Sequence, residues 1–115
     1  MLGGAIARGL AEAGAKVAIV GRHRERGADL VNKIAASGGT AGFFPADATS
    51  RESLGKARRA IEKKFGTASV LVNAAGGNDP AVNATPEHPF ESIEFGDWQT
   101  HFALNVGGGI LLPCQ

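Results

Sequence analysis

Three short apolar runs, each ending in small or polar residues, constrain most strongly what this chain can fold into. They are KVAIV at residues 16–20, AGFFPA at 41–46 and SVLVN at 69–73. Their side chains are largely apolar on both faces, which is typical of strands in a parallel sheet that helices cover on both sides. We therefore predict three buried strands.

Segments with helical periodicity separate and follow these runs. In AIARGLAEAG, Ile6 and Leu10 are predicted to lie one helical turn apart on an apolar face that Ala13 completes, and Gly14 is a natural stop for the helix. Ser50 is a predicted N-cap. The four predicted helices cover residues 5–14, 24–39, 50–66 and 97–115. Strands that alternate with helices predict one α/β domain over residues 1–115, with a doubly wound parallel sheet.

Charge and cysteine content narrow the function classes. The 12 Lys and Arg residues are interpreted as alternating with the 11 Asp and Glu residues instead of collecting in one block, at a net charge of +1. That interpretation argues against nucleic-acid and membrane partners. Cys114 has no second cysteine to pair with, and no Cys/His cluster, signal peptide or long apolar span is recognised. We therefore expect a cytoplasmic protein without a bound metal.

Ligands of parallel α/β sheets bind beyond the carboxyl ends of the strands. Four places in the sequence are predicted to meet there: the glycines before Ala5, residues 21–24, Asp47 with its neighbours, and residues 73–77. The Pro- and Asn-containing stretch 77–96 is a long loop of the kind that covers a ligand. The sequence therefore predicts a ligand site at this edge of the sheet.

In this order, the four places resemble the dinucleotide-binding half of the short-chain dehydrogenase/reductase family. Members carry Thr-Gly-x-x-x-Gly-x-Gly after their first strand, and MLGGAIARGL matches only the end of that motif, with Gly3 on its third glycine. The resemblance implies an incomplete Rossmann-like sheet, without the first and the C-terminal strands, in a chain truncated at both ends. The family's first strand lies between those predicted at 16–20 and 69–73. We therefore expect the chain alone to be unstable or to aggregate, unless these two strands close up or another polypeptide fills the gap.

The resemblance also assigns coenzyme contacts. Asp47 falls where the family contacts the adenine amino group, although an Asp after a strand also suits a turn or a helix cap. VNAAGG is similar to the family's Asn-Asn-Ala-Gly stretch, with Ala74 in place of the second Asn, and its small residues leave room for the ribose. The implied cofactor-binding residues are Gly3, Arg22, Asp47, Ala48, Asn73, Ala74, Ala75 and Gly76.

The residue that follows KVAIV bears on the choice of coenzyme. Dinucleotide folds that bind NAD usually have a carboxylate there to hold the adenosine ribose hydroxyls, whereas this chain has Gly21. Arg22 comes next and can offer a planar guanidinium to a 2′-phosphate, unless it is an ordinary solvated loop residue. We therefore predict a preference for NADP, with NAD as the other candidate.

The family's catalytic residues are incomplete in this chain. Asn105, in HFALNVGGGILL, falls on the family's catalytic Asn, which by resemblance helps to hold a water that links the active-site lysine to solvent. The family's proton donor is a Tyr followed four residues later by a Lys and aided by a Ser, and this chain contains no Tyr. The resemblance implies an NADP-preferring oxidoreductase of alcohols and ketones, with sugars or polyols as candidate substrates. We expect it to be homo-oligomeric at full length and inactive as these 115 residues.

Two other interpretations stay open. A non-catalytic nucleotide-binding or regulatory module would need no Tyr. A methyltransferase-like α/β domain shares the early layout but usually has a carboxylate where Gly21 stands, so it ranks below the other two.

Overall fold

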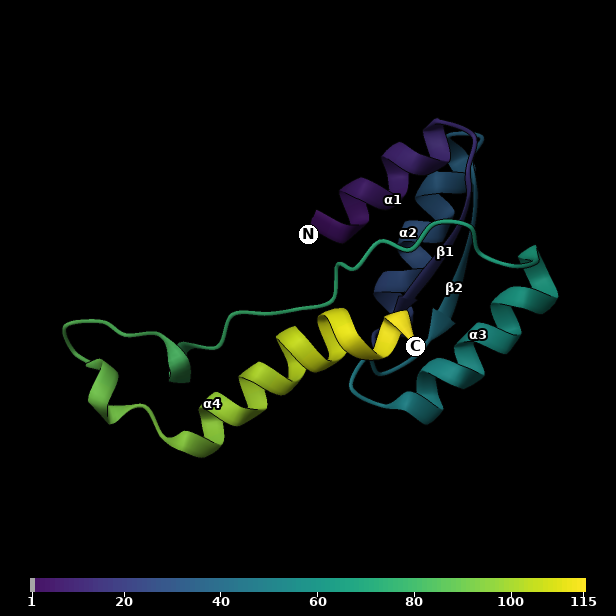
Figure 1. Cartoon of the computed structure of the whole chain (residues 1–115). Coiled ribbons are helices and arrows are strands. Elements are labelled where there is room, and N and C mark those ends of the chain that lie inside the picture. The colour runs from purple at the N-terminus through teal and green to yellow at the C-terminus, as the bar shows by residue number, and fades with distance from the viewer. Residues whose placement is uncertain (1) are drawn as a thin grey trace.

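The computed structural model describes residues 2–115. Figure 1 shows a body, made by three helices and a two-stranded sheet, and an arm, residues 78–102, that extends away from it. The body contains α1 (Leu2–Glu12), β1 (Lys16–Gly21), α2 (Arg24–Ala36), β2 (Thr40–Pro45) and α3 (Arg51–Phe65). The remaining elements are the short 3₁₀ turns η1 (Pro80–Val82) and η2 (Phe90–Ser92), helix α4 (Phe95–Phe102), the π-helix η3 (Ala103–Leu111) and the last turn η4 (Leu112–Cys114). The predictions of the first three helices and the first two strands are confirmed.

The sheet is covered on both faces. β1 and β2 pair in parallel, from Lys16 opposite Thr40 to Gly21 opposite Pro45. Helices α1 and α2 pack on one face around a core of Ala7, Ala11 and Ile34. Helix α3 packs on the other face around Phe44, Ala46 and Ala57. Because successive strand residues point to opposite faces, this layering explains why both strands are apolar after their first residues, Lys16 and Thr40. The chain therefore has the predicted α/β class with a parallel sheet.

Short-range signals set where the body's helices begin and end. The Ser50 hydroxyl oxygen accepts a hydrogen bond from the Ser53 N–H at 3.2 Å, which confirms Ser50 as an N-cap. Gly14 and Gly66 follow α1 and α3 with φ of 91° and 86°, a conformation that side chains other than glycine rarely adopt. The helix stop predicted at Gly14 is therefore confirmed.

The inward face of α1 differs from the prediction. Ala7 and Ala11 are buried against Ile34, whereas Leu10 keeps 37% of its surface exposed and Ile6 is half-buried. Methyl side chains let α1 approach α2 and the sheet more closely than larger side chains would. Ile6 and Leu10, two of the larger apolar residues of α1, therefore lie at the side of the helix and are only partly covered.

The third predicted strand does not form. Residues 69–73 make no sheet ladder, and Val70, Leu71 and Val72 keep 72%, 56% and 45% of their surface exposed. A strand is held by hydrogen bonds to a neighbouring strand, and the edge of β1 opposite β2 carries no partner among residues 2–115. The segment therefore crosses the body as extended chain (Figure 1) and does not close up against β1.

The last helix is longer and wider than an ordinary α-helix. It starts at Phe95, two residues before the predicted start at Asp97, and from Ala103 it continues as the π-helix η3. Phe95, Trp98 and Phe102 stack along the arm, with ring centroids 6.4 Å and 5.0 Å apart, and all three are exposed. The triple glycine at residues 107–109 lies inside this π-helix.

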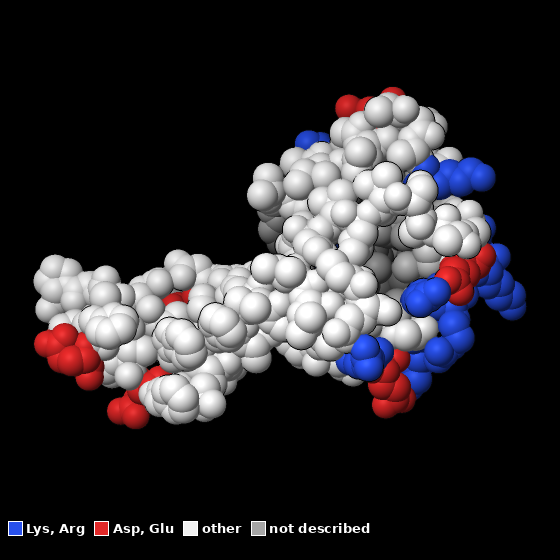
Figure 2. All heavy atoms as spheres, in the orientation of Figure 1, with Lys and Arg blue, Asp and Glu red and all other residues white. Residues whose placement is uncertain are grey.

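The charges are segregated along the chain, so the interpretation of alternating charge is wrong. All 12 Lys and Arg residues lie between Arg8 and Lys64, together with six of the acidic residues. The residues after Lys64 carry five acidic side chains and no basic one: Asp79, Glu87, Glu91, Glu94 and Asp97. Figure 2 shows the basic side chains over the body and only acidic ones on the arm. Within residues 2–115, no helix is both long and apolar enough to cross a membrane.

Candidate functional site

A cleft of about 450 Å³ lies beyond the carboxyl ends of β1 and β2. Its walls come from the loop after each strand, from the start of the arm, and from α4 with the first residues of η3. This is the edge at which parallel α/β sheets bind ligands, as the sequence predicts. The lining residues are Arg22, Asp47, Thr49, Gly77, Asn78, Asp79, Thr100, His101, Ala103 and Leu104.

Asp47 lies in this cleft as a carboxylate held in the turn before α3, with a cation nearby. Its Oδ1 accepts hydrogen bonds from the Thr49 hydroxyl at 2.7 Å and from the Thr49 N–H at 2.9 Å. These two bonds, the hydroxyl first, lower the pKa of Asp47 below its ordinary value of 3.8, and the charge of Arg22 adds to them. Oδ2 makes no hydrogen bond within residues 2–115 and is able to accept one from a ligand. The turn and the ligand interpretations of Asp47 are therefore compatible.

Asn105 ties η3 to the glycine-rich segment. Its Oδ1 accepts a hydrogen bond from the Gly77 N–H, and its Nδ2 donates one to the Gly77 carbonyl, both at 3.1 Å. A Cβ on Gly76 would lie 2.8 Å from the same Oδ1, so only glycine leaves room for this contact. The structure thus brings together two predicted site residues, Asn105 and Gly76.

His101 is one of several cleft residues that were not predicted as site residues from the sequence. Its Nε2 lies 3.0 Å from the Asn105 Nδ2, and its ring lines the cleft. The sequence did hold a signal, because His101 precedes Asn105 by four residues and shares its helix face.

Two glycines of the triplet let η3 touch the loop after β2 and the glycine-rich segment. A Cβ on Gly109 would lie 2.8 Å from the Ala75 carbonyl oxygen, and one on Gly108 would lie 3.1 Å from the Ala48 carbonyl carbon. A Cβ on Gly107 would meet nothing within 4 Å. The triplet is therefore explained at two of its three positions, and it brings the loops of Ala48 and Ala75 to a single helix.

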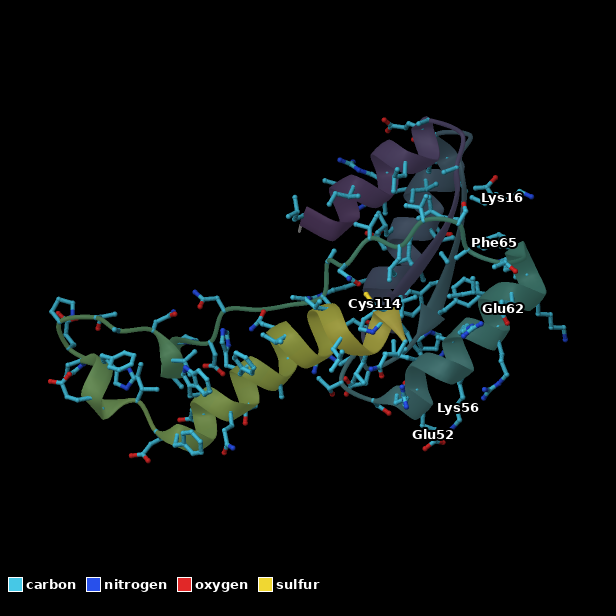
Figure 3. The ribbon with its side chains drawn as sticks, viewed as in Figure 1. Lys16, Glu52, Lys56, Glu62, Phe65 and Cys114 are labelled. Carbon is cyan, nitrogen blue, oxygen red and sulfur yellow. The ribbon has the colours of Figure 1, made fainter. Side chains whose placement is uncertain are left out.

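The other predicted residues lie beside the cleft and do not line it. A Cβ on Gly3, in the first turn of α1, would lie 3.2 Å from the Ala74 Cβ, so α1 touches the glycine-rich segment. Asn73 donates a hydrogen bond to the Cys114 sulfur at 3.6 Å, and Figure 3 shows Cys114 at the end of the yellow helix. Of the eight predicted cofactor residues, only Arg22 and Asp47 border the cleft itself.

The charged side chains of α3 belong to the solvent face. Lys56 pairs with Glu52 at 2.6 Å, and Figure 3 shows both on the outer side of the helix, away from the sheet. Within residues 2–115, no group of three or more His, Cys, Asp or Glu side chains is arranged to hold a metal ion.

Comparison with protein families gives a match over nearly the whole chain. The sequence profile described as short chain dehydrogenase matches residues 2–114. The uncharacterized oxidoreductase UxuB of Bacillus subtilis is 41% identical over 90% of this chain and 36% of its own length. D-threitol dehydrogenase of Mycolicibacterium smegmatis is 31% identical over 99% of this chain and 41% of its own length. The chain thus spans about two fifths of these curated relatives.

Solved structures agree with the match. A protein assigned as D-mannonate oxidoreductase from Haemophilus influenza, with bound NAD, is 28% identical and superposes with a TM-score of 0.90 over 100% of this chain and 44% of its own. L-sorbose reductase from Gluconobacter frateurii, complexed with NADPH and L-sorbose, is 26% identical, with a TM-score of 0.75 over 94% of this chain and 39% of its own. The two-stranded sheet and its helices are therefore part of a Rossmann-like fold.

Proposed function

Because the chain belongs to the short-chain dehydrogenase family, we propose that it forms the coenzyme-binding part of an NAD(P)-dependent oxidoreductase that interconverts an alcohol and a ketone. The observation that carries this proposal is the cleft beyond β1 and β2, where a guanidinium, a carboxylate and a glycine backbone meet. When bound, the coenzyme would supply or accept the hydride. The residues described below bind and orient it.

The cleft suits the adenosine end of a dinucleotide. Its volume of about 450 Å³ falls in the range of small-molecule pockets. Asp47 is ionised at neutral pH and keeps Oδ2 for the adenine amino group, while the backbone of Ala48 lies alongside. The glycine-rich segment of Asn73, Ala74, Ala75 and Gly76 would lie under the ribose. Gly3 would let the first turn of α1 approach the pyrophosphate.

Arg22 is the basis for proposing that NADP is preferred over NAD. It follows Gly21, so no carboxylate at the end of β1 repels a 2′-phosphate, and it is exposed at the cleft. The coenzymes in the two solved structures differ, NAD in one and NADPH in the other. The proposed preference for NADP therefore rests on Gly21 and Arg22 alone.

Catalysis is assigned only in part. We propose that Asn105 is the family's catalytic Asn, and its contact with Gly77 would keep it beside the coenzyme. Since the chain contains no Tyr, we expect the 115 residues to bind coenzyme without reducing a ketone. A purely nucleotide-binding protein would also bind coenzyme without reducing a ketone. The gene of such a protein would lack a Tyr-x-x-x-Lys motif downstream, and the gene of an enzyme would contain one.

The proposed substrate class is a sugar, a sugar acid or a polyol. Support comes from the relatives, which include a D-threitol dehydrogenase, an L-sorbose reductase and a protein assigned as D-mannonate oxidoreductase. These printed substrates share a polyhydroxylated carbon chain. The proposed location is cytoplasmic, and the proposed assembly of the full-length enzyme is a homo-oligomer.

Calorimetric titration of the chain with NADPH, NADH and S-adenosylmethionine tests the proposal. We expect NADPH to bind more tightly than NADH, and S-adenosylmethionine not to bind. Arg22→Ala should weaken NADPH binding about tenfold to a hundredfold and leave NADH unchanged, since charge-assisted hydrogen bonds contribute roughly 1.5–3 kcal/mol. Arg26→Ala, which removes an exposed arginine of α2 outside the cleft, is the matched control. Equal or tighter NADH binding would overturn the role of Arg22, and no dinucleotide binding would overturn the proposed function.

A further inference from the structure

We propose that His101 is a positioning residue that holds the Asn105 amide in place only while its imidazole is neutral. The contact is the pair of nitrogens 3.0 Å apart, His101 Nε2 and Asn105 Nδ2, at the wall of the cleft. Neither the family match nor the coenzyme enters this step. It rests on the hydrogen-bond arrangement around one amide.

The orientation of the Asn105 amide is fixed by Gly77. Oδ1 faces the Gly77 N–H and Nδ2 faces the Gly77 carbonyl, each at 3.1 Å. Turning the amide over would set donor against donor and acceptor against acceptor. The atom beside His101 is therefore the donor nitrogen Nδ2.

A donor at this place requires an acceptor on the ring. Nδ2 has two hydrogens, and three acceptors lie within reach: the Gly77 carbonyl at 3.1 Å, the His101 carbonyl at 3.0 Å and the His101 Nε2 at 3.0 Å. Nε2 accepts only in the neutral tautomer that carries its proton on Nδ1. Protonation would place a second donor opposite Nδ2, so either the ring or the amide must move.

The surroundings allow His101 to exchange protons with water. Its side chain is half-buried and lines the open cleft. The charged groups that share the cleft are Arg22 from the loop after β1, Asp47 from the loop after β2, and Asp79 from the start of the arm. On its own helix, Asp97 lies one turn earlier. A proton can therefore reach Nε2 from the cleft without unfolding of the helix.

The consequence reaches the glycine-rich segment. If the ring no longer accepts from Nδ2, the amide can rotate toward other partners and its two bonds to Gly77 weaken together. This last step rests on the proposed function. If the chain binds a coenzyme, its affinity for the coenzyme should fall as decreasing pH protonates the His101 ring.

The test is a pH titration of the full chain by NMR, with ¹⁵N in Asn, Gly and His. We expect the Asn105 side-chain NH₂ and the Gly77 N–H to shift with one common midpoint, equal to that of the His101 ring, and the neutral ring to carry its proton on Nδ1. His101→Phe should abolish the shift. His101→Gln supplies an uncharged acceptor and should restore the neutral-pH spectrum at every pH. His88→Gln, in the arm and bonded to the Asn83 carbonyl, is the matched control and should leave the titration unchanged.

Three results would overturn the proposal. The first is a neutral ring that carries its proton on Nε2. The second is a transition that persists in His101→Phe while the α3 signals stay native. The third is a set of Asn105 signals that do not change while the His101 ring signals titrate. These outcomes do not depend on coenzyme. Failure of NADPH and NADH to bind at pH 8 would count against the proposed function and would leave the role of His101 standing.

Discussion

The side-chain amide of Asn105 makes two hydrogen bonds to the backbone of Gly77, one with its N–H and one with its carbonyl, each 3.1 Å long. Gly77 belongs to a segment without any sheet ladder, and Asn105 belongs to the π-helix that returns from the arm. These two hydrogen bonds therefore hold the segment at Gly77, where no neighbouring strand does so.

Replacing Asn105 with Ala should free the Gly77 backbone. Two hydrogen bonds are lost and one helix face gains a small cavity, so the free energy of unfolding should fall by about 1–3 kcal/mol. Urea unfolding measures this, and the Gly77 amide should exchange faster with deuterium. Asn78→Ala removes a neighbouring amide that has no hydrogen bond within residues 2–115, and it should change neither value. Equal effects of the two substitutions would contradict the contact.

Gly109 and Gly107 should respond differently to the same substitution. Gly109→Ala puts a methyl group 2.8 Å from the Ala75 carbonyl oxygen, and overpacking of this kind costs about 1–3 kcal/mol. Gly107→Ala meets nothing within 4 Å and removes a flexible residue from a helix, so it should be neutral or stabilising. Thermal unfolding of the two variants makes the comparison. If Gly107→Ala also destabilised the chain, the glycines would be required by the π-helical backbone and not by their contacts.

Stability should fall with pH through the titration of Asp47. Because its pKa is lowered on folding, the stabilisation is complete above the ordinary value of 3.8 and is lost as pH decreases through the lower folded value. Thr49→Val removes the largest cause, the hydroxyl donor, and should move the pKa of Asp47 back upward. Carboxyl ¹³C titration measures the pKa. An unchanged midpoint in Thr49→Val would refute this account.

The chain should self-associate through the exposed segment at 69–73. Val70, Leu71 and Val72 are consecutive exposed apolar residues, and the edge of β1 opposite β2 carries no partner within residues 2–115. Leu71→Lys should therefore reduce light scattering and shift sedimentation toward monomer. Thr67→Lys adds the same charge at an exposed position outside the apolar run. A monodisperse wild-type chain with a cooperative thermal transition would contradict the expectation.

Local signals in the sequence were sufficient to predict the body. Helices α1 to α3 and strands β1 and β2 carry their periodicity and their caps, such as Ser50, within a few residues. The failure at residues 69–73 has a different origin. Their β-rich composition is that of a strand, but a strand also needs a neighbour, and pairing is a property of the whole sheet.

The candidate site was predictable as a location and only partly as a set of contacts. The strand-exit rule indicated Arg22, Asp47 and the glycine-rich segment, and the cleft lies at that edge. The polar partner of Asn105 was not predicted, because helix spacing alone does not tell which neighbouring side chain completes an amide. The uneven distribution of charge could have been predicted from the order of the residues. The net charge of +1 for the whole chain does not reveal it.

The body carries an excess of basic residues and the arm carries only acidic ones, and the cleft lies where these two parts meet. Arg22 and Asp47 line the cleft from the body, and Asp79 lines it from the arm. A phosphorylated molecule that approaches the cleft is attracted from one side and repelled from the other, so it is turned before it makes contact. Its phosphates should lead toward the body, and raising the ionic strength should slow its arrival more than its departure.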